Sequence, residues 1–468
     1  MKDLTKGNVV SQLVLFSLPM ILSDLIQGIQ SIIDVFWLGR LTDYVGVSAV
    51  SITMPIVFIL MAVLVGVGAS SGILIGQSFG AKDYKTLGKV LKNSFTITLV
   101  LSSILGLIGF ILSVPVLKLI GSPRNIFDLS LIYLQVLTIT LPLASTYNWF
   151  IGVMRGLGNS RIVLVFSIIF IVLKLIITPL LISGLWIIPS LGVLGAALSA
   201  AIVEFLLLII AYVYLMRKYE IIRNNIGFEF DGEIISKFIA IGLPVSIQMI
   251  IVSSSAAVLM GFISKFGEKA IATFGIGNRI DQFAFLPAMS MGTSIMTFVS
   301  QNLGANREDR VSEALKWGMI ISISISLVVA VIVNLFSTGI FRFFVSDNEV
   351  VMMGKSYLFI MSFSYVLMGI VFALQGVIRG AGDTLTVLII KAFSMILIRV
   401  PIAYLLAFVA SRSPNGIWAS FSAVMLFESI VSYFYYKSGK WKGKVIFRRR
   451  AEEKIIPEFE VLSNEPFD

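Results

Sequence analysis

The sequence predicts an all-α integral membrane protein with twelve transmembrane helices in two six-helix lobes. Of its 468 residues, 57% are hydrophobic and only 13% are charged, whereas about a quarter of an ordinary soluble chain is charged. Twelve apolar segments are long enough to cross a bilayer. Motifs of the first half also recur in the second half, so we expect the lobes to be related by a pseudo-two-fold axis along the membrane normal.

The apolar segments follow one another along nearly the whole chain, separated by polar loops. A helix needs about 20 apolar residues to cross the hydrocarbon core, and these segments meet that length: 12–39, 46–78, 92–120, 130–153, 162–185, 191–215, 236–263, 272–300, 314–344, 354–378, 386–410 and 416–436. They divide the chain into four parts: an N-terminal lobe (1–216), a linker (217–235), a C-terminal lobe (236–436) and a basic tail (437–468).

The distribution of lysine and arginine predicts the orientation. An even number of spans places both termini on one side, and the loops of that side hold most of the basic loop residues, as in the run from Lys82 to Lys92. Cytoplasmic loops collect these residues, so both termini are expected in the cytoplasm and the chain in the cell (plasma or inner) membrane. The net charge of +10 then favours contact of the tail with anionic lipid headgroups rather than with nucleic acid.

The two halves share motifs at an almost constant separation, close to half the length of the chain. Three pairs keep this separation to within one position: Phe16–Pro19 with Ile241–Pro244, Gln77–Ala81 with Gln301–Ala305, and Met154–Gly158 with Ile378–Gly382. Each half has an even number of spans, so both halves insert in the same orientation. Two such bundles facing each other are typical of secondary transporters that work by alternating access.

One face of the first span is polar. At about 100° per residue, a single arc of the helix carries Ser23, Asp24, Gln27, Gln30, Ser31 and Asp34. Polar groups at membrane depth normally face protein or a water-filled cavity, so this helix is predicted to line a wet cavity with Asp34 deep inside it.

Other polar residues extend this predicted substrate cavity. We assign to it Asp24, Gln27 and Ser31 of the first span, Gln248 of the seventh and Asp281 of the eighth. Two of them have alternatives that stay open: Asp24 could instead cap or pair with a helix, and Asp281 could instead be structural.

Several residue types and motifs are missing. The chain has no cysteine and no histidine, so neither disulfides nor thiolate metal sites can form, and proton chemistry must rest on carboxylates. No GxxxxGK[ST] motif for nucleotide hydrolysis occurs, and no paired acidic motif for a catalytic Mg²⁺ is visible. The glycine-rich runs 155–158 and 379–382 fit tight turns between helices. We therefore expect a protein that is not an enzyme and that has no cofactor or metal.

Six motifs in a fixed order carry a family resemblance: Asp34–Gly39, Gly76–Asp83, Met154–Gly158, Arg279–Pro287, Gln301–Ala305 and Arg399–Tyr404. In this order and spacing the chain, from about residue 8 to 440, resembles the multidrug and toxic compound extrusion (MATE) family of cation-coupled exporters. The resemblance implies export of small amphipathic, often cationic, drugs in exchange for Na⁺ or H⁺. We expect the chain to act in the lipid bilayer as a monomer.

The resemblance also implies a cation-coupling site. Asp34 stands at the family's first-span carboxylate and Asn148 near its fourth-span amide, and we add Gln30 and Lys174. In the fifth span the family often carries Asn and, four residues later, Asp, where this chain has Lys174 and Thr178. Lysine offers no oxygen ligand, so H⁺ is favoured over Na⁺ as the coupling ion.

Two ion pairs are predicted from the repeat. Lys174 recurs as Arg399 and Glu204 as Glu428, in the fifth and sixth helices of each lobe. Unpaired charges at that depth are costly, so Lys174–Glu204 and Arg399–Glu428 are predicted to be structural clamps. As the alternative, Lys174 points at Asp34 and takes part in transport.

A different substrate class would fit the same helix pattern. A lipid-linked oligosaccharide flippase, or another solute exporter of the same superfamily, is the alternative function. A flippase should show more cationic residues in its cavity, because its substrate carries a pyrophosphate.

Overall fold

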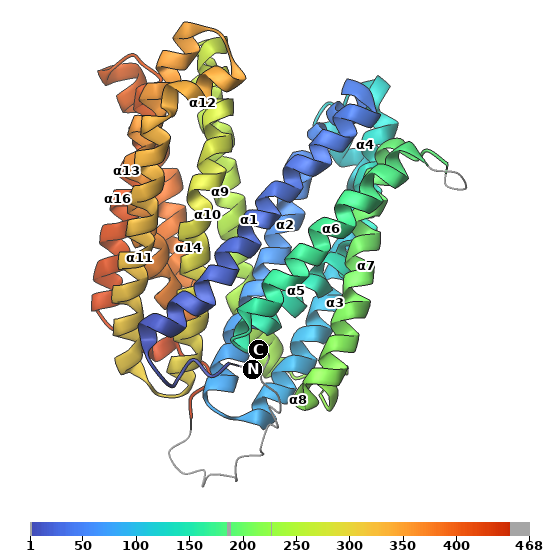
Figure 1. Cartoon of the computed structure of the whole chain (residues 1–468), viewed down its shortest axis with the longest axis vertical. Coiled ribbons are helices and arrows are strands. Elements are labelled where there is room, and N and C mark those ends of the chain that lie inside the picture. The colour runs from blue at the N-terminus through green and yellow to red at the C-terminus, as the bar shows by residue number, and fades with distance from the viewer. Residues whose placement is uncertain (1, 185–188, 226, 450–468) are drawn as a thin grey trace.

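The computed structural model describes residues 2–184, 189–225 and 227–449, apart from the side chains of residues 30–32, 34, 35, 43 and 44. Eleven described helices are long and apolar enough to cross a membrane, and a bent pair raises the number of spans to twelve. The predicted all-α membrane fold is therefore confirmed (Figure 1).

In the described part of the first half the chain folds into seven helices, and the linker adds a short one. Their bounds are α1 (Val9–Leu41), α2 (Asp43–Gly80), α3 (Tyr84–Leu119), α4 (Arg124–Ile139), α5 (Leu141–Gly156), α6 (Ser160–Ser183), α7 (Gly192–Lys218) and α8 (Glu220–Arg223). Asn8, Asp83 and Asn159 stand directly before α1, α3 and α6, and each side chain accepts a hydrogen bond from a backbone N–H of the first turn. Such caps satisfy donors that the helix itself leaves unpaired.

The second half repeats this arrangement. It comprises α9 (Gly232–Ser264), α10 (Glu268–Gly304), α11 (Glu308–Leu335), α12 (Ser337–Phe344), α13 (Asn348–Gly380), α14 (Thr384–Ala392), the π-helical η1 (Phe393–Arg399), α15 (Val400–Tyr404), the π-helical η2 (Leu405–Ala410), α16 (Asn415–Lys437) and the 3₁₀ turn η3 (Lys440–Lys444). Segments α14 to η2 form one continuous span. Pro401 lies in α15, between the two π-helical segments.

The fourth span is broken. The single span predicted for 130–153 consists of α4 and α5, which meet at an angle of 47°. Pro142 lies in the first turn of α5, where proline is tolerated because the backbone N–H groups there have no helical partner. The break therefore coincides with a residue that cannot continue the hydrogen bonding of α4.

The turn geometry confirms the internal repeat. Lys82 and Asn306, which occupy equivalent positions in the two halves, both have positive φ, 57° and 58°. Gly158 and Gly382 stand at the same separation with φ of 75° and 95°. The glycine-rich runs are thus tight turns between helices, as predicted from the sequence.

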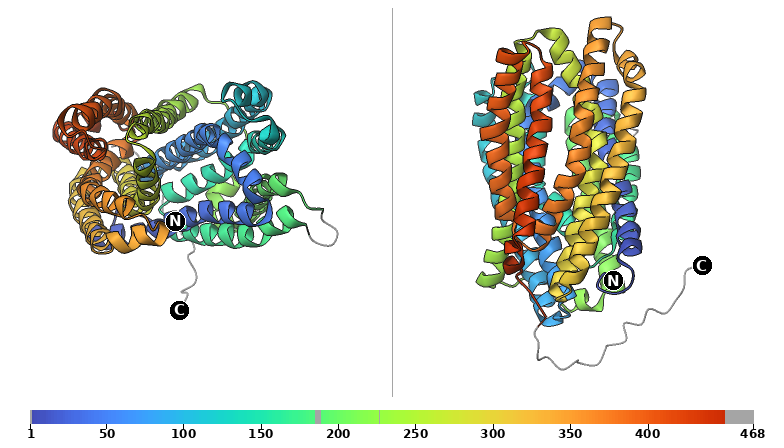
Figure 2. Two further views of the ribbon diagram at one scale, coloured as in Figure 1. Left: turned by 90° about the horizontal axis from the view of Figure 1, so that it is seen from above. Right: turned by 90° about the vertical axis from the view of Figure 1, so that its left-hand side faces the viewer.

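The two lobes touch at one end and lie apart at the other (Figure 1). Seen from above, their helices form two adjacent groups (Figure 2). We call the end that holds residues 2–8 and 440–449 the closed end, and the opposite one, near α4 and α12, the open end. Contacts between the lobes run mainly from α2 to α9 and α10, and from α1 to α10.

The largest hydrophobic core spans both lobes. It joins Leu13 and Ile75 of the first half to Met291, Ile295 and Val299 of the second, and all five side chains are nearly fully buried. A second core lies wholly within the C-terminal lobe, around Tyr357 and Trp418. The two lobes are therefore joined by continuous apolar packing.

Candidate functional site

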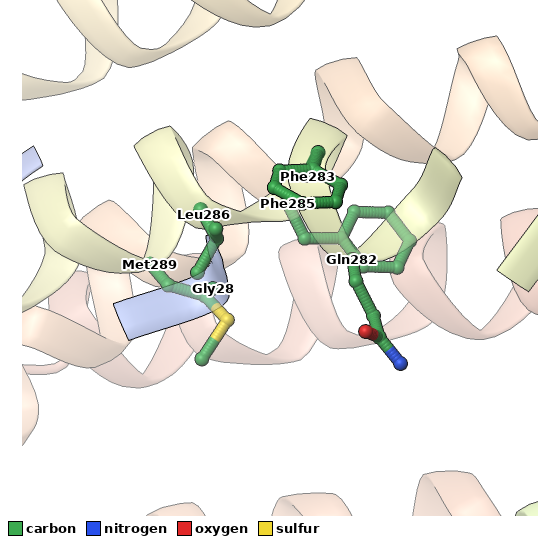
Figure 3. Close-up of a pocket in the computed structure, with 6 residues that line it drawn as sticks. All are labelled: Gly28, Gln282, Phe283, Phe285, Leu286 and Met289. Carbon is green, nitrogen blue, oxygen red and sulfur yellow. The ribbon is translucent and has the colours of Figure 1, made fainter. Parts of the chain in front are cut away.

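A cavity of about 240 Å³ lies where α1 of the N-terminal lobe faces α10 of the C-terminal lobe. Figure 3 shows its lining, which is mostly apolar: Gly28 from α1, and Gln282, Phe283, Phe285, Leu286 and Met289 from α10. A Cβ atom added to Gly28 would lie 3.1 Å from Leu286 Cδ1. The glycine therefore allows the two helices to approach closely beside the cavity.

Asp24, one helical turn before Gly28, joins three helices. Its carboxylate accepts a hydrogen bond of 2.5 Å from Ser290 Oγ of α10 and forms an ion pair with Arg155 of α5 at 3.6 Å. About one fifth of the Asp24 side chain remains exposed. The contact with Ser290 crosses between the lobes, so Asp24 is a helix partner, one of the two alternatives left open by its position in the sequence.

The side chains on the polar face of α1 differ in how far they are buried. Ser23 is fully buried and its hydroxyl lies 2.6 Å from Ser167 Oγ of α6, whereas Gln27 is exposed. Gln30, Ser31 and Asp34 lie on the backbone of α1, but their side chains are outside the described part of the structure. Their assignment to the cavity and to cation coupling stays a prediction.

The repeat places an arginine–glutamine contact where the N-terminal lobe has an arginine–aspartate ion pair. Arg379, the counterpart of Arg155, donates a hydrogen bond of 2.7 Å to Gln248 Oε1. The Gln248 amide nitrogen donates to Thr384 O at 3.2 Å, and the side chain is buried. The prediction that Gln248 lines the cavity is therefore wrong, because both ends of its amide are engaged inside the C-terminal lobe.

Asp281 is also buried within the C-terminal lobe. Its carboxylate accepts hydrogen bonds from Tyr365, at 2.7 Å, and from Tyr357. These tyrosines lie on one face of α13, and Asp281 is only 5% exposed. The assignment of Asp281 to the cavity is wrong, and the structural alternative holds.

Replacing Tyr365 with phenylalanine is expected to lower the stability of the C-terminal lobe. A hydrogen bond to a charged group contributes about 1.5–3 kcal/mol, and the substitution removes one of the two that Asp281 receives from tyrosines. The measurement is the midpoint of thermal unfolding in detergent. Tyr212→Phe is the control, because Tyr212 lies on α7 with 57% of its surface exposed. Equal midpoints for the two variants would contradict the prediction.

The acid of the predicted C-terminal clamp has a different partner. Glu428 is fully buried and its carboxylate lies 2.6 Å from Lys391 Nζ. Ser394 and Gln375 also donate to it, at 2.5 and 3.3 Å. The predicted Arg399–Glu428 pair is wrong. The guanidinium of Arg399 instead lies over the Phe421 ring, 4.7 Å from its centre.

The fifth span of the C-terminal lobe explains why Glu428 pairs with Lys391 and not with Arg399. Lys391 precedes the π-helical segment η1 and Arg399 is its last residue. The position that matches Lys391 in the first half is Ser167, an uncharged residue. The comparison of charges between the two halves therefore does not reveal Lys391. A lysine inside an apolar span nevertheless indicates by itself that a partner for its charge must lie nearby.

Lys174 of α6 is 3% exposed, and Glu204 lies on α7, the helix that packs against α6. The Asp34 side chain is outside the described residues, so the choice between Glu204 and Asp34 as the main partner of Lys174 stays a prediction. Asn148 donates its amide N–H to Ala144 O of the same helix at 3.0 Å. Thr178 donates to Ser199 Oγ at 3.0 Å.

The fold and the polar residues between its lobes define a membrane transporter, and sequence comparison identifies its family. The MatE family model matches residues 19–180 and 244–405, one copy in each lobe and at the same separation as the repeated motifs. The chain belongs to the MatE family, which confirms the predicted resemblance.

Curated relatives extend over nearly the whole chain. The probable multidrug resistance protein YoeA of Bacillus subtilis is 29% identical over 95% of this chain and 96% of its own. The probable multidrug resistance protein YpnP of the same organism is 30% identical over 96% and 99%. The multidrug export protein MepA of Staphylococcus aureus is 28% identical over 81% and 83%.

Solved structures share the fold at lower identity. A MATE protein in complex with MaL6 superposes with a TM-score of 0.86 at 20% identity, over 94% of this chain and 98% of its own. An outward-facing multidrug resistance MATE transporter gives 0.85 at 20% identity, over 95% and 99%.

Proposed function

We propose that this protein exports small amphipathic or cationic organic molecules from the cell in exchange for H⁺ or Na⁺. The observation that carries the proposal is the arrangement of the two repeated lobes, which touch at one end only (Figure 1). Two facing repeats that rock against each other can open a central site to either side of a membrane in turn. The names of the curated relatives, which refer to multidrug resistance and export, support the substrate class.

The closed end faces the cytoplasm in this proposal. Its loops and terminal segments carry many basic residues, among them Lys82, Lys85, Arg307, Lys442 and Lys444, and basic loops remain on the cytoplasmic side. The structure then represents the outward-facing state of a transporter in the plasma membrane. Both termini are cytoplasmic in this orientation.

The cavity between α1 and α10 supports an apolar substrate with few polar groups. Two phenylalanines, a leucine and a methionine line it, and Gln282 supplies its polar side chain. Methionine adapts readily to differently shaped ligands. A lipid-linked pyrophosphate would require cations here, and the described lining contains neither lysine nor arginine, which favours drug export over the flippase alternative.

Asp34 is the coupling carboxylate of the proposed mechanism, with Gln30, Asn148 and Lys174 as the other members of the site. Asp24, the other carboxylate on the polar face of α1, already forms an ion pair with Arg155 and accepts a hydrogen bond from Ser290. When a proton binds Asp34, its negative charge is lost, and so is its attraction for any nearby cation, whether substrate or lysine. Proton uptake from outside and release inside would thereby be linked to the rearrangement of α1.

Transport in proteoliposomes with separately imposed gradients tests this function. We expect a pH gradient without a Na⁺ gradient to drive movement of a fluorescent cationic dye, and a protonophore to abolish it. The expectation rests on Lys174 and Thr178, which occupy places where the family often offers oxygen ligands. Transport driven by a Na⁺ gradient at constant pH, and insensitive to the protonophore, would make Na⁺ the coupling ion. Absence of dye movement under both gradients would contradict the proposed function.

A further inference from the structure

Two equivalent glutamines join the lobes at the closed end. Gln77 of α2 and Gln301 of α10 occupy matching positions of the repeat, and both side chains are 0% exposed. The Gln77 amide nitrogen donates to Gly380 O of the C-terminal lobe at 3.0 Å. The Gln301 amide nitrogen donates to Gly156 O of the N-terminal lobe at 2.8 Å. The two acceptor glycines also match each other in the repeat, so the pair of contacts follows the pseudo-two-fold symmetry.

The amide oxygen of each glutamine binds a terminal segment of the chain. Gln301 Oε1 accepts a hydrogen bond from Leu4 N at 3.0 Å. Gln77 Oε1 accepts from Ile446 N at 2.9 Å and from Phe447 N at 3.1 Å. The segment that leads into the N-terminal lobe thus binds the glutamine of the C-terminal lobe, and the segment that leaves the C-terminal lobe binds the glutamine of the N-terminal lobe.

The N-terminal segment, residues 2–7, is fastened to both lobes. Lys2 N donates to Leu157 O of the N-terminal lobe at 3.1 Å. In the C-terminal lobe, Arg310 is 7% exposed and donates to the carbonyl oxygens of Gly7, Leu4 and Lys6 at 2.7, 3.2 and 3.3 Å. Leu4 itself is fully buried. The segment therefore fills the junction between the lobes.

The C-terminal segment, residues 445–449, is held on the C-terminal lobe beside Gln77. Arg449 N donates to Gly304 O at 2.9 Å, and Asn306 Nδ2 donates to Arg449 O at 2.9 Å. Glu308 forms ion pairs with Lys442 at 2.9 Å and with Arg448 at 3.2 Å. The segment is thereby fixed where its backbone N–H groups reach the opposite lobe.

The two long helices cross in direct backbone contact at this place. A Cβ atom on Gly80 would lie 1.9 Å from Gln301 O, and one on Gly304 would lie 2.0 Å from Gln77 O. These glycines let α2 and α10 approach as closely as small residues allow in membrane helix pairs. Opening this end would separate each glutamine amide nitrogen from its glycine acceptor in the opposite lobe and Gln77 Oε1 from the C-terminal segment. It would also break the bonds of the N-terminal segment to one of the two lobes.

We propose that the N-terminal and C-terminal segments are latches that hold the closed end shut through Gln301 and Gln77. The proposal rests on the alternating movement of the lobes in the proposed function. It adds that the balance between the two states is set by chain segments outside the transmembrane helices. Release of either segment removes hydrogen bonds only from the closed state, so the population shifts toward the state that is open at this end.

Distances between spin labels measure that population directly, by pulsed electron paramagnetic resonance in lipid nanodiscs. The chain has no cysteine, so labels can be placed without removing native residues. Lys85→Cys with Glu313→Cys reports on the closed end, and Asn125→Cys with Ser346→Cys reports on the open end. All four positions are exposed, and each pair has one residue in each lobe.

Two chain-shortening variants test the latches without changing a helix. One lacks residues 2–5, and the other ends after Lys444. A chain that ends after Arg449 is the matched control for the second, because it keeps all the contacts of residues 445–449. Each latch contributes several hydrogen bonds, and one bond changes an equilibrium by about threefold to tenfold. We therefore expect each shortened chain to raise the ratio of the opened to the closed state at least about tenfold, and the control to match the full chain.

Side-chain variants test the same contacts independently. Gln77→Met and Gln301→Met keep the length of the side chain and remove its amide. Gln135→Met on α4 is the control, because Gln135 lies within the N-terminal lobe. We expect longer closed-end distances and shorter open-end distances for the first two variants only. Distances unchanged from the full chain in both the shortened chains and the folded glutamine variants would overturn the latch.

The proposed latch and the proposed function are tested by different measurements, so either can be excluded without the other. The spin-label distances are recorded without substrate, whereas the proposed function is tested by dye transport. A shift in the shortened chains would support the latch even if the full chain transported no dye. Transport by the full chain with no shift in any variant would leave the function standing and exclude the latch.

Discussion

Replacing Asp34 with asparagine is expected to abolish gradient-driven export while leaving the folded protein in the membrane. Asparagine has nearly the same shape but cannot exchange a proton near neutral pH, so uptake of the coupling ion would no longer change the charge on α1. The measurement is dye movement in proteoliposomes under an imposed pH gradient, with the amount and thermal unfolding of the variant recorded in parallel.

Asp128→Asn is the control for this experiment, because Asp128 is an exposed carboxylate on α4. It should export at the rate of the unaltered protein. Export by Asp34→Asn against a gradient at that same rate would exclude Asp34 as the coupling group.

Replacing Lys391 with methionine should destabilise the C-terminal lobe by about 3–5 kcal/mol, the usual cost when one partner of a buried ion pair is removed. Glu428 is fully buried and would lose the cation that lies 2.6 Å away. Adding Glu428→Gln to the same chain should restore most of the loss, because the uncompensated charge is then gone. The midpoint of thermal unfolding in detergent gives the comparison.

Lys269→Met provides the exposed counterpart. Lys269 pairs with Glu349 at 2.6 Å, but about half of the lysine side chain and three quarters of the glutamate side chain remain exposed. Surface pairs of this kind contribute little, so the midpoint should barely move. A loss for Lys391→Met no larger than for Lys269→Met would contradict the structural role of the buried pair.

The fold could be predicted because the sequence features that determine it recur many times along the chain. Each span needs only length and apolar composition, and the separation between the two halves appears in several motifs at once. Asn8, Asp83 and Asn159 mark helix starts by a local hydrogen bond, which a sequence pattern can reveal. The bend between α4 and α5 depends on one proline near the middle of an apolar run, a weaker signal.

The polar contacts were harder to predict because they depend on which helices meet. Gln248 and Asp281 lie in spans that do reach the interface between the lobes, but each side chain is turned into its own lobe by Arg379 or by two tyrosines. Periodicity identifies a polar face and not its neighbour. The repeat predicted equivalent charges at Lys174 and Arg399, but the π-helical segment η1 and the extra lysine at position 391 alter the C-terminal lobe.

The partners of Gln77 and Gln301 could not be predicted from the sequence either. Their motifs were recognised as a strong sign of the repeat, yet nothing near them in the sequence indicated what they bind. The partners of Gln77 Oε1 lie 369 and 370 residues away, in a basic tail that composition assigned only to lipid headgroups.

These distant contacts also have a consequence for biosynthesis. Leu4 leaves the ribosome among the first residues, but its acceptor, Gln301, is synthesised 297 residues later. At about 5–20 residues per second, the buried site for Leu4 does not exist for roughly the first quarter of a minute or longer. During that time the nascent N-terminal lobe must sit in the membrane with its contact face uncovered. The junction between the lobes is thus completed only when translation of the chain is nearly finished.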